Sequence, residues 1–428
     1  MGEIQQSDNY ALFAREIIDS RIISDPWVEG RERFRLEPEI LSAELGRRLG
    51  DAIESVGRVW DEMIGILQRE PELVSRHFHL SEWQRVMWIA SAGAWHGIAR
   101  GDAFVLEDGA IRICELNADT PSGEPEGVIL NAIRHRFHPD LTDPNRDFRR
   151  KFLTMVDRSY RATFGPLAPP PRVGIVYPTD LPEDLSMIEL YRGWFQQEGW
   201  DVEPGSPYNL ARDGRGYLTL LGRPITLVLR HYKTDWWGER EPVLIDDQDY
   251  RDPDPLDDPL RAILGAEVDG KVAVVNPFGA ILAQNKLAMA FLHAEIDRLS
   301  PESRQAVLSH IPRSVRLMDI DPEQLIDERD SWVLKSDFGC EGDEVILGPM
   351  ATDEAWERMV RNARPDRWIA QEFFDAAVRE DGTIPNYGLF LIGGEAGGIF
   401  TRFSSASTDY RAVTAPTFIR EDHVVDSR

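Results

Sequence analysis

Three oxygen-bearing side chains lie at alternate positions near the end of one predicted strand. Glu115, Asn117 and Asp119 are each two residues apart in the stretch ICELNADTPSG. Because successive side chains of a strand point to opposite faces, these three are expected on one face. Carboxylate and amide oxygens are the ligands that a hard cation such as Mg²⁺ takes in proteins. The spacing therefore raises the question of a metal site.

A predicted hairpin adds a carboxylate to this face. Residues 103–117 have the pattern of a β-hairpin, with Asp108-Gly109 as a two-residue turn. That turn places Asp102 directly opposite Glu115, and opposed carboxylates repel each other. A bound cation would compensate for the repulsion, whereas an odd-numbered loop would shift the register by one and remove the pairing.

We therefore predict Asp102, Glu115 and Asn117 as metal ligands. The alternative is a hairpin end with solvated acids. For Asp119 the sequence favours a turn or capping role, since Thr120-Pro121 follows and a loop must begin there.

Cationic residues further along the chain fit a nucleotide partner for such a metal. In WVLKSDFGCEGDEVILG, a strand carries Lys335 and leads into a loop with Gly339 and Gly342, whose backbone N–H groups can cover phosphates. Lys286 opens an apolar helix. The alternatives are a plain hairpin for the loop and a solvated helix start for the lysine.

Two further strands complete the set of candidates. The strand WIAQEFF ends in Gln371 and Glu372, a form that can present backbone groups to an adenine edge, and is otherwise an ordinary edge strand. Arg402 lies on the glycine-flanked strand GGIFTRF, where the alternative is a surface ion pair.

The elements that must position these residues indicate an α/β protein. Residues 1–100 have mostly helical periodicity, and residues 172–299 alternate between buried strands and helices. The remainder of the chain is rich in strands. The stretch LAPPP at 167–171 predicts a stiff boundary.

Composition excludes several classes of partner for this chain of 428 residues. The net charge of −26 argues against nucleic acid and could attract a cationic substrate, although a solvated acidic surface is the simpler interpretation. No apolar run approaches the roughly 20 residues of a membrane helix. Two cysteines do not make a disulfide framework, so we expect a reducing cytoplasm. The sequence does not indicate an oligomeric state.

Five segments, taken in order, resemble the glutathionylspermidine synthase family, specifically its ATP-grasp synthetase domain. They are RGDAFVLEDGAIRICELNADTP, HYKTDWW, NPFGAILAQNK, VLKSDFGCEG and GGIFTR. The metal carboxylates precede the lysines, which agrees with the circularly permuted ATP-grasp arrangement of that family. The resemblance implies a helical region plus metal-binding hairpin at 1–170, a small α/β pre-ATP-grasp domain at 171–275, and a nucleotide-binding region at 276–428.

The resemblance also implies a role for each candidate residue. Asp102, Glu115 and Asn117 would ligate Mg²⁺, and ATP would be held by Lys286, Lys335, Gly339, Gly342, Gln371 and Glu372. Arg100 would lie near the reacting carboxylate, and Arg402 would steady an acyl phosphate and the later oxyanion. Thr120, Ser122 and Asp409 would contact substrate. The implied reaction is ATP-dependent amide formation between a small carboxylate, such as a peptide, and an amine, for which a cationic one is preferred.

Departures from the family pattern point to a changed substrate pair. Cys340 replaces the arginine of its G-R-E-G loop, Ser336-Asp337 replaces K-P, and Phe403 and Ser404 replace the acids of I-R-E-D. A second hypothesis is therefore a non-catalytic ATP-binding protein that regulates or assembles. A metal-dependent hydrolase built on Asp102 and Glu115 is disfavoured, because the sequence positions no histidine beside them.

Overall fold

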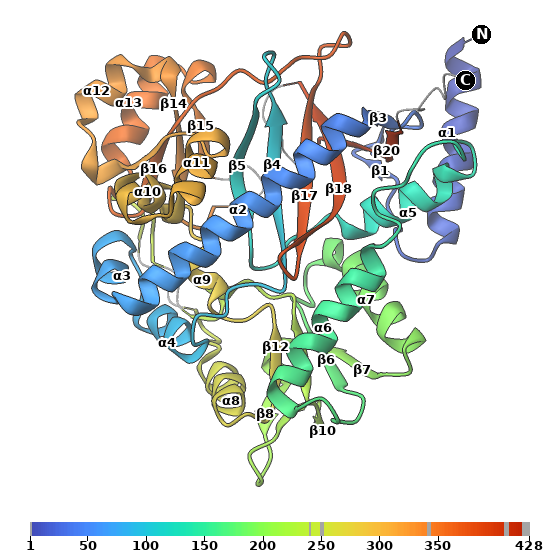
Figure 1. Cartoon of the computed structure of the whole chain (residues 1–428), viewed down its shortest axis with the longest axis vertical. Coiled ribbons are helices and arrows are strands. Elements are labelled where there is room, and N and C mark those ends of the chain that lie inside the picture. Colours follow the sequence, from blue (N-terminus) through green and yellow to red (C-terminus); the bar gives the residue numbers. More distant parts are fainter. Residues whose placement is uncertain (1, 239–240, 249–251, 340–343, 406–410, 422–428) are drawn as a thin grey trace.

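The computed structural model describes residues 2–238, 241–248, 252–339, 344–405 and 411–421. In it, one antiparallel sheet of five strands lies at the centre of the molecule (Figure 1). Its strands, in spatial order, are β19 (Val413–Ala415), β18 (Glu395–Ser404), β17 (Ile384–Ile392), β4 (Ile98–Val105) and β5 (Ile111–Asn117). Strands from both ends of the chain therefore share this sheet, and the β4–β5 hairpin forms one of its edges.

The long helix α2 (Ala43–Arg69) crosses one face of the sheet (Figure 1). It begins at Ser42, whose hydroxyl accepts the Leu45 backbone N–H at 3.1 Å. The close approach requires glycine, because a Cβ on Gly57 would come within 2.7 Å of a Leu391 methyl group. The short helices α3 (Glu72–His77) and α4 (Glu82–Ala90) follow, so the helical periodicity of the first 100 residues is confirmed.

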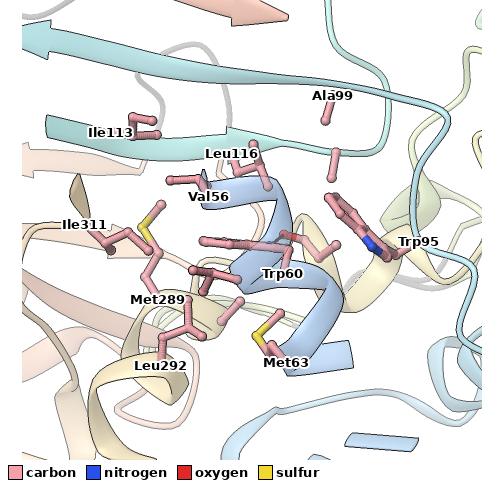
Figure 2. Close-up of a cluster of buried hydrophobic side chains, with 14 of the residues drawn as sticks. Val56, Trp60, Met63, Trp95, Ala99, Ile113, Leu116, Met289, Leu292 and Ile311 are labelled. Atoms are coloured by element: carbon pink, nitrogen blue, oxygen red, sulfur yellow. Dashed lines mark hydrogen bonds between the residues drawn. The ribbon is translucent and has the colours of Figure 1, made fainter. Parts of the chain in front are cut away.

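The largest hydrophobic core fills the space between α2 and the sheet. Val56 and Trp60 of α2 pack with Ile113 and Leu116 of β5 and with Met289 (Figure 2). All five side chains are almost fully buried. The burial of this apolar surface is the main contribution that holds the β4–β5 hairpin against α2.

A second antiparallel sheet, of four strands, follows further along the chain. Its spatial order is β13 (Ser314–Arg316), β16 (Trp368–Glu372), β14 (Trp332–Ser336) and β15 (Val345–Leu347). The helices of this part are α9 (Ala280–Ala283), α10 (Leu287–Ala294), α11 (Pro301–His310), α12 (Pro322–Asp327) and α13 (Asp353–Asn362).

A parallel sheet forms the small α/β unit expected from the alternating pattern. Its spatial order is β12 (Ala273–Val275), β11 (Leu227–Arg230), β6 (Arg172–Val176) and β7 (Asp201–Gly205). It is accompanied by α6 (Phe148–Phe164), α7 (Leu185–Gln197) and α8 (Asp257–Val268), and by the small antiparallel sheet of β8 (Leu210–Arg212), β9 (Leu218–Leu220) and β10 (Arg223–Pro224).

The two ends of the described chain meet on one side of the molecule (Figure 1). β3 (Glu39–Ser42) pairs in parallel with β20 (Thr417–Arg420). α1 (Gly2–Asp19), α5 (Glu124–His135) and the short hairpin of β1 (Trp27–Val28) and β2 (Arg31–Glu32) complete this side. None of the described helices combines the length and apolar character needed to cross a bilayer.

Candidate functional site

The β4–β5 hairpin has the predicted pairing at the site but a different turn. Asp102 faces Glu115, as the sequence predicts. The predicted two-residue turn is wrong: Leu106 N–H donates to Ala110 O at 2.8 Å, so the loop has three residues. Gly109 takes a left-handed φ of 80°, which this loop type requires at its last position.

A β-bulge restores the pairing that the odd-numbered loop shifts. Ala103 faces Ile113, whereas Asp102 faces Glu115, so Cys114 is an extra residue without a partner on β4. As a result Ile113 and Leu116, three residues apart, both pack in the core with α2 (Figure 2). Glu115 is thereby turned to the opposite face, which Asp102 shares.

Asp102 is held by two guanidinium groups. Arg100 Nε donates to its Oδ1 at 2.8 Å, and Arg402 Nη2 donates to its Oδ2 at 2.8 Å. Burial raises the pKa of the Asp102 carboxyl, but the two arginines outweigh burial and hold this pKa below its usual value. A further Arg100 N–H donates to Ser122 O at 2.6 Å. The protein's own cations therefore supply compensation that the sequence argument assigned to a metal ion.

Glu115 has a looser environment. Its Oε1 lies 3.7 Å from Lys286 Nζ, and its side chain is 19% exposed. With its amide oriented to satisfy both neighbours, Asn117 donates to Glu115 Oε1 at 3.0 Å and accepts from Arg100 Nη2 at 3.2 Å. Glu115 is thus the carboxylate with free acceptor positions.

Two buried lysines approach β5 from other elements. Lys335 Nζ on β14 donates to Cys114 O at 3.0 Å and to Gln371 Oε1 at 2.7 Å. Lys286, just before α10, donates to Gly339 O. Lys335 donates only to neutral acceptors, whereas Lys286 also lies 3.7 Å from the Glu115 carboxylate, so Lys335 has the less compensated charge. The carbonyl that Lys335 reaches belongs to the bulge residue.

The residues expected around the nucleotide take partly different roles. Gln371 is buried and positions Lys335, while its amide N–H₂ group donates to Ser314 Oγ at 3.1 Å. Glu372 is exposed, and its backbone N–H donates to Arg313 O. Gly339 N donates to Ser336 Oγ at 2.9 Å and does not point its N–H into open space.

The candidate substrate residues lie at the end of β5. Thr120 is half-buried, and Ser122 is exposed with its backbone carbonyl on Arg100. Gly342, Cys340 and Asp409 lie outside the described residues. Asp119, in contrast, is buried and structural: its carboxylate pairs with Arg230 and accepts from Thr234 N at 2.6 Å.

Asn276 is a connecting residue that sequence reasoning missed. Its side-chain oxygen accepts from Gly97 N at 2.7 Å and Ile98 N at 2.9 Å, and its amide donates to Ile98 O and Asp119 O. One side chain after β12 thus holds the start of β4 and the end of β5 together. Its place beside Pro277 gave no signal of this role.

Glu124 is a second residue that sequence reasoning missed. It is fully buried at the start of α5, with one oxygen accepting from the Tyr191 hydroxyl at 2.9 Å and the other without a hydrogen-bond partner among the described residues. Burial raises the pKa of Glu124 to about 7, and Arg100 is among the charges that oppose this rise. Only its place in GEPEG, directly after the candidate substrate loop, could have drawn attention to it.

Asp337, one of the residues that departs from the family pattern, has a clear structural role. Asp337 is fully buried and receives two parallel hydrogen bonds from Arg367, at 2.7 and 2.9 Å. Arg367 also donates to Glu241 O at 2.6 Å. This pair ties the end of β14 to the start of β16 and to the segment that precedes α8.

Comparison with known proteins bears on the fold. Residues 246–381 match the family model described as circularly permuted ATP-grasp type 2. This chain has a circularly permuted ATP-grasp fold. A glutathione synthetase-like effector from Globodera pallida is similar in structure, with a TM-score of 0.61, 10% identity and 97% of each chain covered.

A putative gamma-glutamylcysteine synthetase from Methylobacillus flagellatus is less similar. Its TM-score is 0.46 at 12% identity, over 89% of this chain and 88% of that one. A search of curated proteins gives no match. The mixed α/β class and the permuted order predicted from the sequence are thus confirmed, whereas the resemblance to the glutathionylspermidine synthase family stays a prediction.

Proposed function

We propose that the protein is an ATP- and Mg²⁺-dependent carboxylate–amine ligase that forms an amide through an acyl phosphate. One observation carries this proposal. Around the Asp102–Glu115 pair, the four cations Arg100, Arg402, Lys286 and Lys335 outnumber the acids by two charges, or by one when the neighbouring Glu124 is ionised, in a protein whose net charge is −26. A local excess of positive charge in an acidic protein favours an anionic ligand such as a nucleoside triphosphate.

The residues of this face would divide the work. Lys335 and Lys286 would hold phosphate oxygens, because Lys335 donates only to uncharged acceptors and Lys286 has a single long ion pair, 3.7 Å from Glu115. Arg100 and Arg402, held by Asp102, would neutralise charge on the transferred phosphoryl group and on the oxyanion of amine attack.

The metal donors fit a magnesium ion that keeps phosphate and water ligands. Glu115 and Asn117 lie on one face, and Asp102 accepts three hydrogen bonds, which leaves about one of its four acceptor positions. A magnesium ion held by Glu115, Asn117 and Asp102 would offset the negative charge of phosphate oxygens. Among the described residues there is no cluster of three or more His, Cys, Asp or Glu side chains, so the remaining ligands would come from the nucleotide and water.

The substrate pair is part of the proposal. We propose a reaction similar to that of glutathionylspermidine synthase but with a different acid and amine, since Asp337 is committed to Arg367 where the family has a proline. A small carboxylate, such as a peptide, and a cationic amine are the proposed substrates, and the cysteine content favours a cytoplasmic location.

The test is ligation itself. The protein is incubated with ATP, Mg²⁺ and pools of carboxylates and amines, while ADP release and product mass are followed. Release that needs both an acid and an amine, and is lost in Glu115→Ala and Lys335→Ala, supports the proposal. Unchanged turnover in either variant would show that the site is assigned wrongly.

The second candidate is a non-catalytic ATP-binding protein. The changed loop favours it, because Ser336-Asp337 stands where the resembling family has lysine and proline, and Asp337 is committed to a buried ion pair with Arg367. It predicts nucleotide binding that Lys335→Ala abolishes, with no acid- and amine-dependent ADP release from the unaltered protein.

A further inference from the structure

A groove of about 470 Å³ lies beside the turn of the β4–β5 hairpin, and none of the proposed ligase residues line it. It is bordered by α2, by the end of α11 and by the start of β5, three elements that pack together (Figure 1). Its volume is within the range of small-molecule sites. The polar side chains that line it are those of Arg48, Asp51, Ser55, Arg112, Ser309 and His310.

Two positive charges in this groove have no carboxylate partner. Arg48 donates to Gly109 O and Arg112 donates to Ser309 O, both uncharged acceptors. Neither arginine forms an ion pair within the described part of the chain. The one acid in the lining, Asp51, is already paired with Arg47 at 2.6 Å. The lining therefore has two arginines against one acid, within a protein whose net charge is −26.

His310 lies within the field of both arginines. Its Nδ1 donates to Ile111 O at 3.1 Å, which fixes the ring in place. Burial lowers the pKa of His310, and the charges of Arg112 and Arg48 lower it further. The three side chains line the same groove, and a bound anion would offset the charges of the two arginines.

We propose that this groove binds a small organic oxyanion, that is, a molecule with phosphoryl or carboxylate oxygens. A guanidinium that spends one N–H on a carbonyl keeps others for a fork-like contact with such oxygens. The Ser309 hydroxyl accepts from Gln305 Nε2 at 2.9 Å and keeps its own O–H to donate to such oxygens. None of the lining residues belongs to the proposed ligase site, so this inference stands independently of that function.

The two positive charges of the groove can be removed while polar side chains are kept. Arg48→Gln/Arg112→Gln replaces both guanidinium groups by neutral amides. The control is Arg223→Gln, which removes an exposed arginine paired with Asp201 and Glu203. Thermal melting checks that all variants fold.

Calorimetric titration without Mg²⁺ then uses pyrophosphate and citrate as separate probes. At least one probe is expected to bind the unaltered protein and Arg223→Gln with equal affinity. Its affinity for the double variant is expected to be lower by about tenfold or more. The two probes distinguish phosphoryl from carboxylate ligands.

A further variant, Lys335→Ala, identifies binding at the nucleotide site. The proposal is overturned if neither probe binds the unaltered protein, if the double variant binds as well as the control, or if only Lys335→Ala loses binding. Retained binding in Lys335→Ala with loss in the double variant supports the groove even if the ligase proposal fails.

Discussion

The two carboxylates that face each other on the hairpin have very different surroundings. Asp102 is enclosed by two arginines, each at hydrogen-bond distance, whereas Glu115 is 3.7 Å from a single lysine. The Asp102 side thus forms a closed ion-pair network that needs no ligand for its stability. On the Glu115 side, the carboxylate has free acceptor positions and the nearby lysines are only partly compensated. This is the state expected of a surface that receives a ligand.

The largest expected effect that tests this comparison is the contribution of Asp102 to the stability of the fold. Asp102→Asn removes the charge that two buried guanidinium groups share, and we expect a loss of about 3–5 kcal/mol in the free energy of unfolding. Glu115→Gln should cost less than about 1 kcal/mol, because its ion pair is long and partly exposed. Urea denaturation of both variants measures the difference, and equal losses would contradict the comparison.

The open side should dominate activity. Lys335→Met is expected to lower the turnover of the ligation assay by about 10²–10³-fold, since it removes the buried charge that the proposed function assigns to the phosphate oxygens. The control is Lys271→Met, because Lys271 is a surface lysine that donates to Arg215 O. A loss in the control as large as that in Lys335→Met would assign the effect to general charge.

A pH experiment sharpens the closed side, because Glu124 interacts with Arg100. The pKa of Glu124 is about 7 in the folded protein against an ordinary value of 4.5. The folded state therefore holds the proton more tightly, and stability is lost as pH rises from about 4.5 to 7. The loss is expected to be about 2–3 kcal/mol, and the Glu124→Gln protein should not show it, because its amide does not titrate. The free energy of unfolding of Glu124→Gln minus that of the unaltered protein should therefore rise over that window and stay level at higher pH.

Denaturation of both proteins at pH 5, 6, 7 and 8 measures this difference. A difference that does not change with pH would show that Glu124 is ionised in the folded protein throughout. The Glu124→Gln side chain can still accept the Tyr191 hydrogen bond, so packing is matched.

The smallest effect concerns the turn that sets the hairpin for both sides. Gly109→Ala forces a Cβ residue into a left-handed conformation, at a cost of about 1–2 kcal/mol in stability. Gly214→Ala is the control, because Gly214 has no positive φ and no atom within 4 Å of an added Cβ. Thermal unfolding that shows equal shifts for both variants would refute the role of the turn.

Much of the hairpin could be predicted because its determinants are local. Asp108-Gly109 predicts a turn, and the alternating residues up to Asn117 indicate a strand. Once a loop length is assumed, the register that pairs Asp102 with Glu115 follows. The prediction reached the right pairing by a partly wrong route. The loop has three residues, and the bulge at Cys114 compensates, which no local pattern of the sequence announced.

The partners of the site residues could not be predicted in this way. Arg402 is 300 residues from Asp102, and Lys335 is 221 residues from Cys114, so their contacts depend on how β18 and β14 pack. The same holds for Asn276, which holds β4 and β5 together from the end of β12.

The sequence by itself determined the α/β class, the order in which carboxylates precede lysines, and the presence of a hairpin that ends in Glu115 and Asn117. These depend on covalent geometry and on periodicity over a few residues. Only the tertiary structure decided that Asp102 is neutralised by arginines while Glu115 stays open, that Glu124 is buried beside them, and that two arginines are left uncompensated beside the hairpin turn. Such charge balances depend on burial and on distances between remote segments, which packing alone sets.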